Sequence, residues 1–241
     1  MDQALARRVR LPALLFMVLL LAACETRSIS NSGYAGRGNP LYRGELTEFD
    51  VLGIDPSRPA GDAEIARGLD RHARIALGKG ARVMVIQSGA LIPDDAMVTA
   101  LAPYFSLVPF SGVPLAPAAG HADDYARALR LAAAKAGAEA ILCYWGVLES
   151  AVEGEPTKVV SWIPLIGQAV PDEAQRMRIR LKLAVIDVRT GEWSMLTPKP
   201  YDDSALSASL TRVASDQRQV EELKQKAYDA AVDALVARFS S

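Results

Sequence analysis

The most regular hydrophobic pattern in the chain lies at residues 177–188, which read MRIRLKLAVIDV. Apolar side chains recur there at every second position, a period that is typical of a strand with one buried face. The turn Arg189-Thr190-Gly191 follows, and residues 192–196 are expected to return as the second strand of a hairpin. This part of the chain therefore predicts antiparallel pairing.

Helical and strand-like segments alternate in the first half of the chain. The helical segments carry apolar residues three or four positions apart, and the strands are short apolar runs bounded by turn residues. The expected helices cover residues 62–76, 93–104 and 123–135, and the expected strands cover 82–87, 105–108 and 140–148. In the third of these helices the residues expected to be buried are Tyr125, Ala128, Leu129, Leu131 and Ala132. This rhythm is typical of α/β packing.

A short strand or extended segment is expected at residues 49–54, and a further strand at 158–163. A long last helix is expected to begin at Ser215 or Asp216. The apolar stripe of that helix consists of Val220, Leu223, Ala227, Ala231 and Leu235. The residues expected to face water are Glu221, Glu222, Lys224, Lys226 and Asp229. The pattern predicts an α/β (α+β) fold class, with a single mixed β-sheet, helices packed on it, and the order α-β-α-β-α-β-β-β-β-α.

The N-terminus has the pattern of a secretory signal peptide. Arg7, Arg8 and Arg10 precede an apolar run at residues 11–21, and small residues follow it. The run is shorter than the roughly 18–20 apolar residues that a permanent membrane-spanning helix needs. Residues 1–23 are therefore predicted to be removed.

The sequence Leu-Ala-Ala-Cys that ends at Cys24 resembles the lipobox of bacterial lipoproteins. The resemblance implies that Cys24 is acylated, and two or three acyl chains hold a protein firmly on a membrane. Glu25 stands where an Asp would favour inner-membrane retention, so the outer membrane is expected. Residues 24–45 are rich in Ser, Gly and Asn and predict a flexible tether, which leaves 46–241 as a single periplasmic domain.

Three stretches resemble a family of Gram-negative bacterial lipoproteins with a TolB-N-terminal-like or curli-secretion-lipoprotein-like α/β domain. They are residues 82–108, the segment YARALRLAAAKAGAEAILCYWG at 125–146, and RIRLKLAVIDVRTGEW at 178–193. The nearest resemblance is to an uncharacterised lipoprotein family within this group. It implies an assembly lipoprotein, a secretion-channel subunit or an activator of wall enzymes, with no shared catalytic residues to transfer.

Composition limits the chemistry. A formal net charge of −1 does not suggest nucleic-acid binding, and two cysteines cannot form a disulfide-rich scaffold. Cys143 lies in the most apolar strand and is expected to be a buried small hydrophobe. With only two histidines and no phosphate-binding loop in the sequence, no cofactor and no metal are expected.

Two candidate contact surfaces stand out. One is a basic stripe on a single strand face, made of Arg176, Arg178, Arg180 and Lys182. It could meet an anionic partner, or it could be a solvated sheet face paired with Glu153, Glu155 or Glu173. The other is an apolar loop that could meet a membrane or a partner, or fold over the core, and its residues are Trp162, Ile163, Leu165, Ile166 and Val170.

The leading hypothesis is an outer-membrane lipoprotein whose periplasmic domain is a non-enzymatic binding or assembly module. Its partners would be the membrane, through Cys24, and an envelope protein or cell-wall component. One alternative is an envelope hydrolase that uses His121, Asp123 or a strand-end serine, Ser88 or Ser111. Another is a subunit of an oligomeric secretion channel, for which a homo-oligomer would be required.

Overall fold

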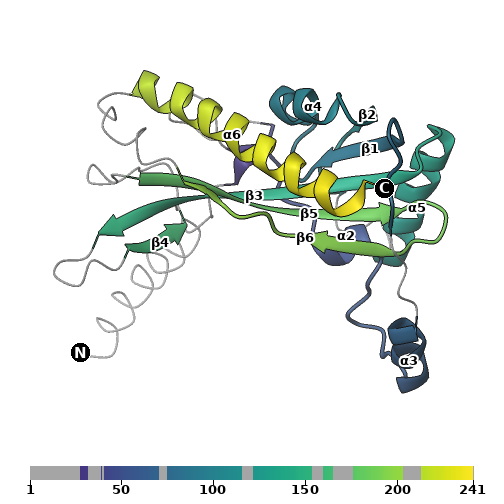
Figure 1. Cartoon of the computed structure of the whole chain (residues 1–241). Helices are drawn as coiled ribbons and strands as arrows, with labels where there is room; N and C mark the ends of the chain where they lie inside the picture. Colours follow the sequence, from purple (N-terminus) through teal and green to yellow (C-terminus); the bar gives the residue numbers. More distant parts are fainter. Residues whose placement is uncertain are drawn as a thin grey trace, which may run out of the picture.

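The computed structural model describes residues 28–31, 39, 41–70, 75–115, 122–153, 160–164, 176–202 and 213–240 (Figure 1). The predicted signal peptide and Cys24 lie outside these residues. None of the helices within the described ranges is both long enough and apolar enough to cross a bilayer.

A mixed sheet of seven strands forms the centre of the fold. The strands are β1 (Arg82–Gln87), β2 (Ser106–Phe110), β3 (Ala140–Glu153), β4 (Val160–Pro164), β5 (Arg176–Asp187), β6 (Trp193–Leu196) and β7 (Tyr201–Asp202). The order across the sheet is β2-β1-β3-β5-β6. The first three strands are parallel, whereas β5 and β6 are antiparallel to their neighbours.

The long strands β3 and β5 pair along their whole length and extend beyond the parallel part of the sheet (Figure 1). In this outer half β4 pairs with β3, and β7 pairs with β5. The outer half of the sheet is therefore built around the pattern of alternating residues in 177–188, and the predicted antiparallel pairing is confirmed.

Helices cover both faces of the sheet. The described helices are α2 (Glu48–Leu52), α3 (Asp62–Asp70), α4 (Asp95–Leu101), α5 (Ala122–Lys135) and α6 (Val213–Phe239), and a 3-10 turn, η1, covers Ile29–Asn31. Helix α3 is not part of either core layer. One core layer joins α4 and α6 to the sheet, and the other joins α2 and α5. The predicted α/β class with one mixed sheet is confirmed, with one more helix and one more short strand than expected.

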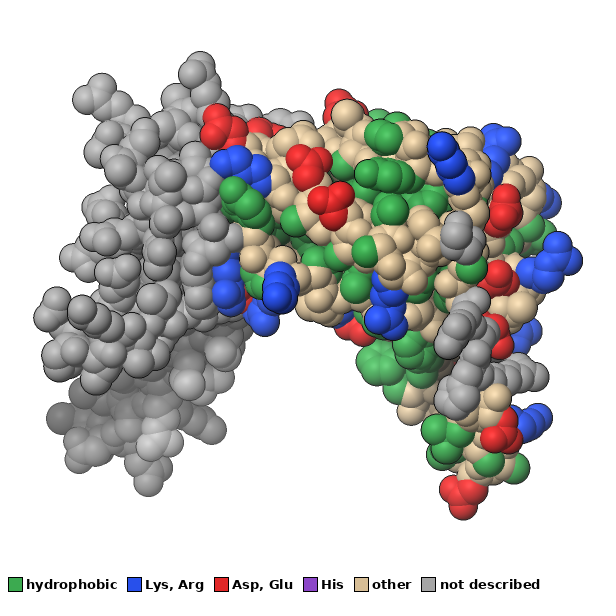
Figure 2. Space-filling view, in the orientation of Figure 1, with side chains coloured by type: hydrophobic (Ala, Val, Ile, Leu, Met, Phe, Trp, Pro, Cys, Tyr) green, Lys and Arg blue, Asp and Glu red, His purple; other side chains and the backbone are tan. Residues whose placement is uncertain are grey.

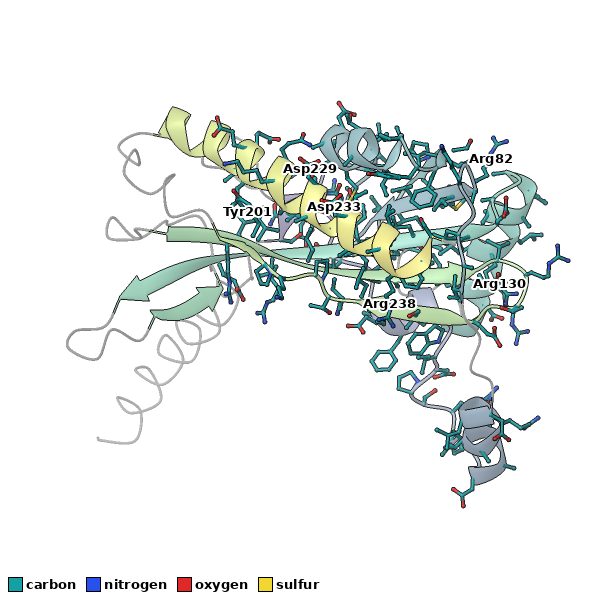
Figure 3. All side chains as sticks on the ribbon, viewed as in Figure 1. Arg82, Arg130, Tyr201, Asp229, Asp233 and Arg238 are labelled. Carbon is teal, nitrogen blue, oxygen red and sulfur yellow. The ribbon has the colours of Figure 1, made fainter. Side chains whose placement is uncertain are left out.

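The C-terminal helix α6 lies along one face of the sheet and buries every residue of its predicted stripe (Figure 1). Figure 3 shows Asp229 and Asp233 on the helix, and both are exposed. The prediction that Lys224 faces water is wrong, since this residue is only 3% exposed. Its Nζ lies 2.9 Å from Oδ2 of Asp94. The helical period places Lys224 beside Leu223 at the edge of the buried stripe, and the acid on α4's N-terminus compensates its charge.

Residues 49–54 were expected to form a short strand or extended segment, and this expectation is wrong because Glu48–Leu52 form a helix. Thr47 caps helix α2 in a capping box with Asp50, and Gly53 ends the helix with φ of 68°. A capping box satisfies backbone donors that a strand would leave for a neighbouring strand, so local hydrogen bonding decides the conformation here.

Two predicted helices present different faces from those expected. In α5, Leu129 is buried, but Ala128 and Leu131 are exposed, and Ala126 and Ala133 are buried instead. Helix α3 begins at Asp62 as predicted, yet it buries none of its residues. It projects away from the sheet, and hydrophobic side chains are visible on this projection in Figure 2.

The turn after β5 is held by α5. Arg130 donates from Nε to the carbonyl of Val188 at 3.0 Å and from a terminal nitrogen to the carbonyl of Arg189 at 2.8 Å. A Cβ on Gly191 would lie 2.5 Å from this guanidinium, and Gly191 has φ of 76°. The predicted hairpin between β5 and β6 is therefore confirmed. Its turn requires glycine at position 191 because a side chain there would collide with Arg130, which Figure 3 labels.

The prediction of a tether over residues 24–45 needs correction where the structure describes it. Ser28, Ile29 and Ser30 are buried against the sheet, and Ser28 forms an antiparallel bridge with Val147. Composition alone suggested mobility, because the segment has few apolar residues. Its polar side chains, however, find partners on the sheet.

Candidate binding site

The order β2-β1-β3 creates a switch point between β1 and β3. The chain leaves β1 through α4 on one face to reach β2, and it leaves β2 through α5 on the opposite face to reach β3. In sheets of this kind, ligands bind in the crevice outside the carboxyl ends of the strands that flank such a point. Gln87 and Ser88 lie there, and both are buried.

The N-terminal turn η1 fills this crevice. Ser30 Oγ donates to the carbonyl of Ser88 at 2.5 Å and accepts from Nε2 of Gln87 at 3.0 Å. The Gln87 side-chain oxygen in turn accepts from the Tyr144 hydroxyl at 2.7 Å and from the backbone N–H of Asp94 at 2.7 Å. The place where the fold would receive a ligand is therefore occupied by its own chain.

A buried polar network continues from this crevice to α6. Tyr228 donates its hydroxyl to Oδ2 of Asp94 at 2.6 Å, and the Tyr144 and Tyr228 rings meet edge to face, with centroids 5.8 Å apart. Burial raises the pKa of both phenols well above the ordinary value near 10. Both hydroxyls therefore stay protonated and act as hydrogen-bond donors.

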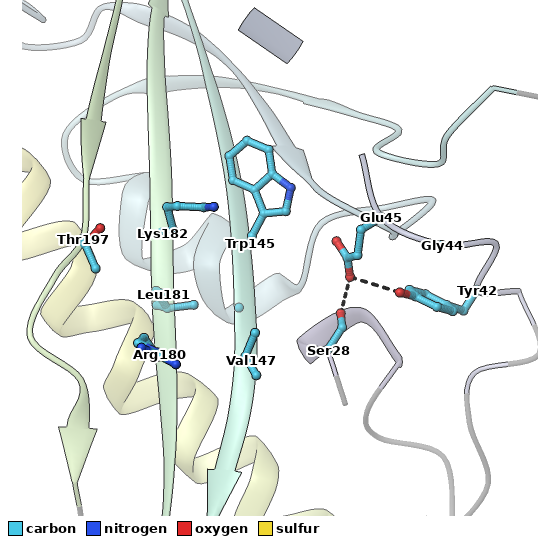
Figure 4. Close-up of a pocket in the computed structure, with 11 residues that line it drawn as sticks. Ser28, Tyr42, Gly44, Glu45, Trp145, Val147, Arg180, Leu181, Lys182 and Thr197 are labelled. Carbon is cyan, nitrogen blue, oxygen red and sulfur yellow. Dashed lines mark hydrogen bonds between the residues drawn. The ribbon is translucent and has the colours of Figure 1, made fainter. Parts of the chain in front are cut away.

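An open pocket lies beside the filled crevice, on the sheet face that also carries α2 (Figure 4). Its volume is about 650 Å³, within the range of about 300–1,000 Å³ for small-molecule sites. It is called the β3–β5 pocket here, and its lining comprises Ser28, Tyr42, Gly44, Glu45, Trp145, Gly146, Val147, Arg180, Leu181, Lys182 and Thr197. The strands β3 and β5 supply the floor.

The floor of the pocket combines apolar and basic side chains, and its wall is fixed. Trp145 and Val147 lie opposite Lys182 and Arg180 in the β3–β5 register, on one face of the sheet. The indole of Trp145 donates to the carbonyl of Leu46 at 2.7 Å, so the ring is held in place. Glu45 accepts from Ser28 Oγ and, at 3.5 Å, from the Tyr42 hydroxyl, which ties the N-terminal wall together (Figure 4).

Part of the predicted basic stripe borders this pocket. Arg178, Arg180 and Lys182 share one face of β5, and Arg180 and Lys182 line the pocket. Arg176 belongs to β5 as predicted, although its side chain lies outside the described part of the structure.

The stripe is paired with an acid that the sequence did not suggest. Glu149 is 1% exposed and accepts from Arg178 Nε at 2.6 Å and from a terminal nitrogen of Arg180. The expected partners Glu153, Glu155 and Glu173 are not among the described side chains. Glu149 is a single acid that directly follows the apolar run at residues 140–148. Its position opposite a row of arginines is the signal that could have identified it.

Lys182 is placed differently from the arginines. Its Nζ pairs with Glu48 on α2 and lies 5.4 Å from the centroid of the Trp145 ring. The side chains of Lys182 and Glu48 are 37% and 44% exposed. Exposed pairs contribute at most about 1 kcal/mol, so Lys182 can exchange Glu48 for another anion at little cost.

The other predicted residues are dispersed. Cys143 is completely buried as expected, and burial raises the pKa of its thiol well above 9.0. Ser88 is also buried, and its Oγ accepts from the backbone N–H of Leu46 at 2.8 Å. Ser111 is partly buried, and its Oγ accepts from the N–H of Val113 at 3.3 Å.

The side chains of several predicted residues lie outside the described part of the structure. Trp162 and Ile163 pair with β3 through the backbone of β4, and the remaining residues of the apolar loop, Leu165, Ile166 and Val170, lie outside the described residues. The same holds for His121 and for the side chain of Asp123. Within the described ranges, no three His, Cys, Asp or Glu side chains gather as a metal site.

The fold defines an α/β domain with one mixed sheet between two helical layers. A model of the YafT bacterial lipoprotein family matches residues 47–238, and the chain belongs to this family. The family makes the protein an envelope-associated lipoprotein that is held at a membrane through lipid. Comparison with curated proteins and with solved structures gave no match.

Proposed function

We propose that the chain is an outer-membrane lipoprotein, acylated on Cys24, whose periplasmic domain is a non-enzymatic module that binds an envelope component in the β3–β5 pocket. The observation that carries this proposal is the position of Ser28. It lines the pocket, it is fixed to β3, and it follows Cys24 by four residues.

The short connection sets how far the domain can stand from the membrane. Four residues span at most about 14 Å when fully extended. An acylated Cys24 would therefore keep the pocket within about 14 Å of the lipid surface, unlike a tether of twenty residues, which would let the domain diffuse freely. Binding beside the membrane is thus favoured over capture of a distant partner.

The anchor is tested by labelling cells with a radioactive fatty acid. The wild-type chain and the variant Cys143→Ala are expected to carry label, because Cys143 is buried in the sheet. Cys24→Ala is expected to lose it. Label that persists in Cys24→Ala would overturn the proposed anchor, and density fractionation of the labelled envelopes tests the outer membrane.

The pocket is tested by placing the photoreactive residue p-benzoylphenylalanine in the full chain and irradiating intact cells. At Thr197, an exposed residue of the pocket, we expect a crosslinked product that mass spectrometry can identify. At Glu222, an exposed residue of α6 outside the pocket, we expect none. Equal products at both positions would contradict the pocket as the binding site. A separate deletion of residues 163–170 tests whether the predicted apolar loop contributes to partner recovery.

A further inference from the structure

The lining of the β3–β5 pocket suits one class of ligand, and the inference about that ligand rests on the proposed function. We propose that the pocket takes one acyl chain of a phospholipid from the adjoining bilayer, with the lipid phosphate at Lys182.

The floor suits a hydrocarbon chain. Trp145 and Val147 supply apolar surface on the face of the sheet that carries the pocket, whereas the Leu181 side chain belongs to the core on the opposite face. The indole N–H, the one polar atom of Trp145, is already bonded to Leu46. An acyl chain that covers Trp145 and Val147 gains roughly 25 cal/mol for each Å² of apolar surface that leaves water.

Of Arg180 and Lys182, Lys182 is the cation that can turn from its partner to the head group of a lipid. Arg180 is held by Glu149, a nearly fully buried acid that it shares with Arg178, and breaking such an arrangement is costly. Lys182 and its partner Glu48 are both exposed, so this pair can open at little cost. A phosphate is therefore expected to meet Lys182 rather than Arg180.

The bilayer is the favoured source. The pocket begins at Ser28, within about 14 Å of an acylated Cys24, so membrane lipids would lie close to its entrance. An acyl chain of the protein's own anchor could also reach it. However, one acyl chain alone anchors a protein only marginally, so withdrawing an anchor chain would weaken attachment. A bilayer phospholipid involves no such loss.

The test uses fluorescence of the full-length acylated protein in vesicles of phosphatidylethanolamine and phosphatidylglycerol. The chain has three tryptophans, and Trp162→Phe with Trp193→Phe leaves Trp145 as the reporter. Bromine on the acyl chains of the vesicle lipids quenches indole emission on contact. We expect loss of Trp145 emission in brominated vesicles.

Two pocket-filling variants separate binding in the pocket from contact with the membrane surface. Val147→Phe and Thr197→Phe, each made in the Trp145 reporter protein, are expected to restore emission, provided that the thermal midpoint is unchanged. Thr197 is exposed, so at least this variant should fold. As a matched control, a protein that keeps only Trp193, which is 45% exposed, is expected to lose less emission than the Trp145 reporter.

Placing the bromine on the protein's own anchor identifies the source of the acyl chain in the pocket. Protein from cells fed a brominated fatty acid carries bromine on its own anchor and is placed in unbrominated vesicles. Quenching of Trp145 here but not in brominated vesicles would overturn the inference in favour of the anchor chain. If Trp145 is quenched in neither arrangement, and mass spectrometry verifies an acylated N-terminal peptide, acyl binding in the pocket would be overturned. The proposed anchor would remain intact. Lys182→Gln is expected to raise the lipid concentration needed for half-maximal quenching, and no change would overturn the assigned head-group contact.

Discussion

A Cβ atom on Gly146 would stand 2.7 Å from Cγ2 of Ile29, so the N-terminal turn and strand β3 fit together only because residue 146 has no side chain. Ile29 is 1% exposed, and the same Cβ would stand 2.8 Å from Cδ2 of Leu181. This relationship makes residues 28–31 part of the folded domain rather than part of a linker.

Substitution of Gly146 by alanine is expected to destabilise the domain by about 1–3 kcal/mol, because an added methyl group must displace Ile29 or Leu181. Urea unfolding measures this change. In an Ile29→Ala background the same substitution should cost less, since the two sites are coupled. Equal costs in both backgrounds would show that Ile29 does not lie against Gly146.

Glu149→Gln is expected to cost about 1.5–3 kcal/mol of unfolding free energy, because hydrogen bonds to a charged partner are lost from two arginines. Glu64→Gln is the matched control. Its pair with Arg58 is largely exposed on both sides, so the cost should stay below about 1 kcal/mol. Similar midpoints for the two variants in a denaturant titration would contradict a structural role for Glu149.

Lys224→Met is expected to destabilise the protein by about 1–3 kcal/mol, since it leaves Asp94 without the ammonium group that compensates its charge. Adding Asp94→Asn should recover part of the loss by removing the remaining charge. Glu222→Met, on the exposed side of α6, provides the control and should change the thermal midpoint little. A double variant less stable than the sum of the single changes would argue against the pair.

Stability is expected to fall in alkaline solution. Burial raises the pKa values of Cys143, Tyr144 and Tyr228 in the folded state. Above about pH 8.5 the unfolded cysteine ionises, and above about pH 10 the unfolded tyrosines ionise, whereas the folded groups retain their protons. The folded state then binds more protons, so unfolding becomes easier as pH rises.

Denaturant titrations between pH 7 and 11 measure this dependence. Cys143→Ala should remove the part of the slope that begins near pH 8.5, where the unfolded Cys143 thiol ionises, and it should leave the fall near pH 10, where the unfolded tyrosines ionise. An ordinary thiol reagent should also react with Cys143 only as the protein unfolds. Rapid reaction with the native protein would contradict the burial of this thiol.

Local pattern was sufficient for much of the fold. Residues 82–87 form a strand with the predicted bounds, and every position of the predicted α6 stripe is buried. These elements were predictable because their hydrophobic period directly reflects which side faces a core. The conformation of residues 49–54 was not predictable in this way, since the Thr47 capping box outweighs the strand propensity of the segment.

The candidate site was predictable only in part. The basic residues Arg178, Arg180 and Lys182 were identified as one face of a strand, and two of them line the pocket. Their partners Glu149 and Glu48 come from other elements. A periodic pattern defines the face on which a charge lies, but it contains no information on which acid lies opposite.

The sequence by itself determined the α/β class, the antiparallel outer strands, the long C-terminal helix and a lipobox-like N-terminus, because each depends on residues close together in the chain. Only the tertiary structure decided that Ser28–Asn31 fill the switch-point crevice and that Trp145, Lys182 and Glu45 meet around one pocket. Those contacts join residues far apart in sequence. They depend on the order and register of strands, which no local pattern specifies.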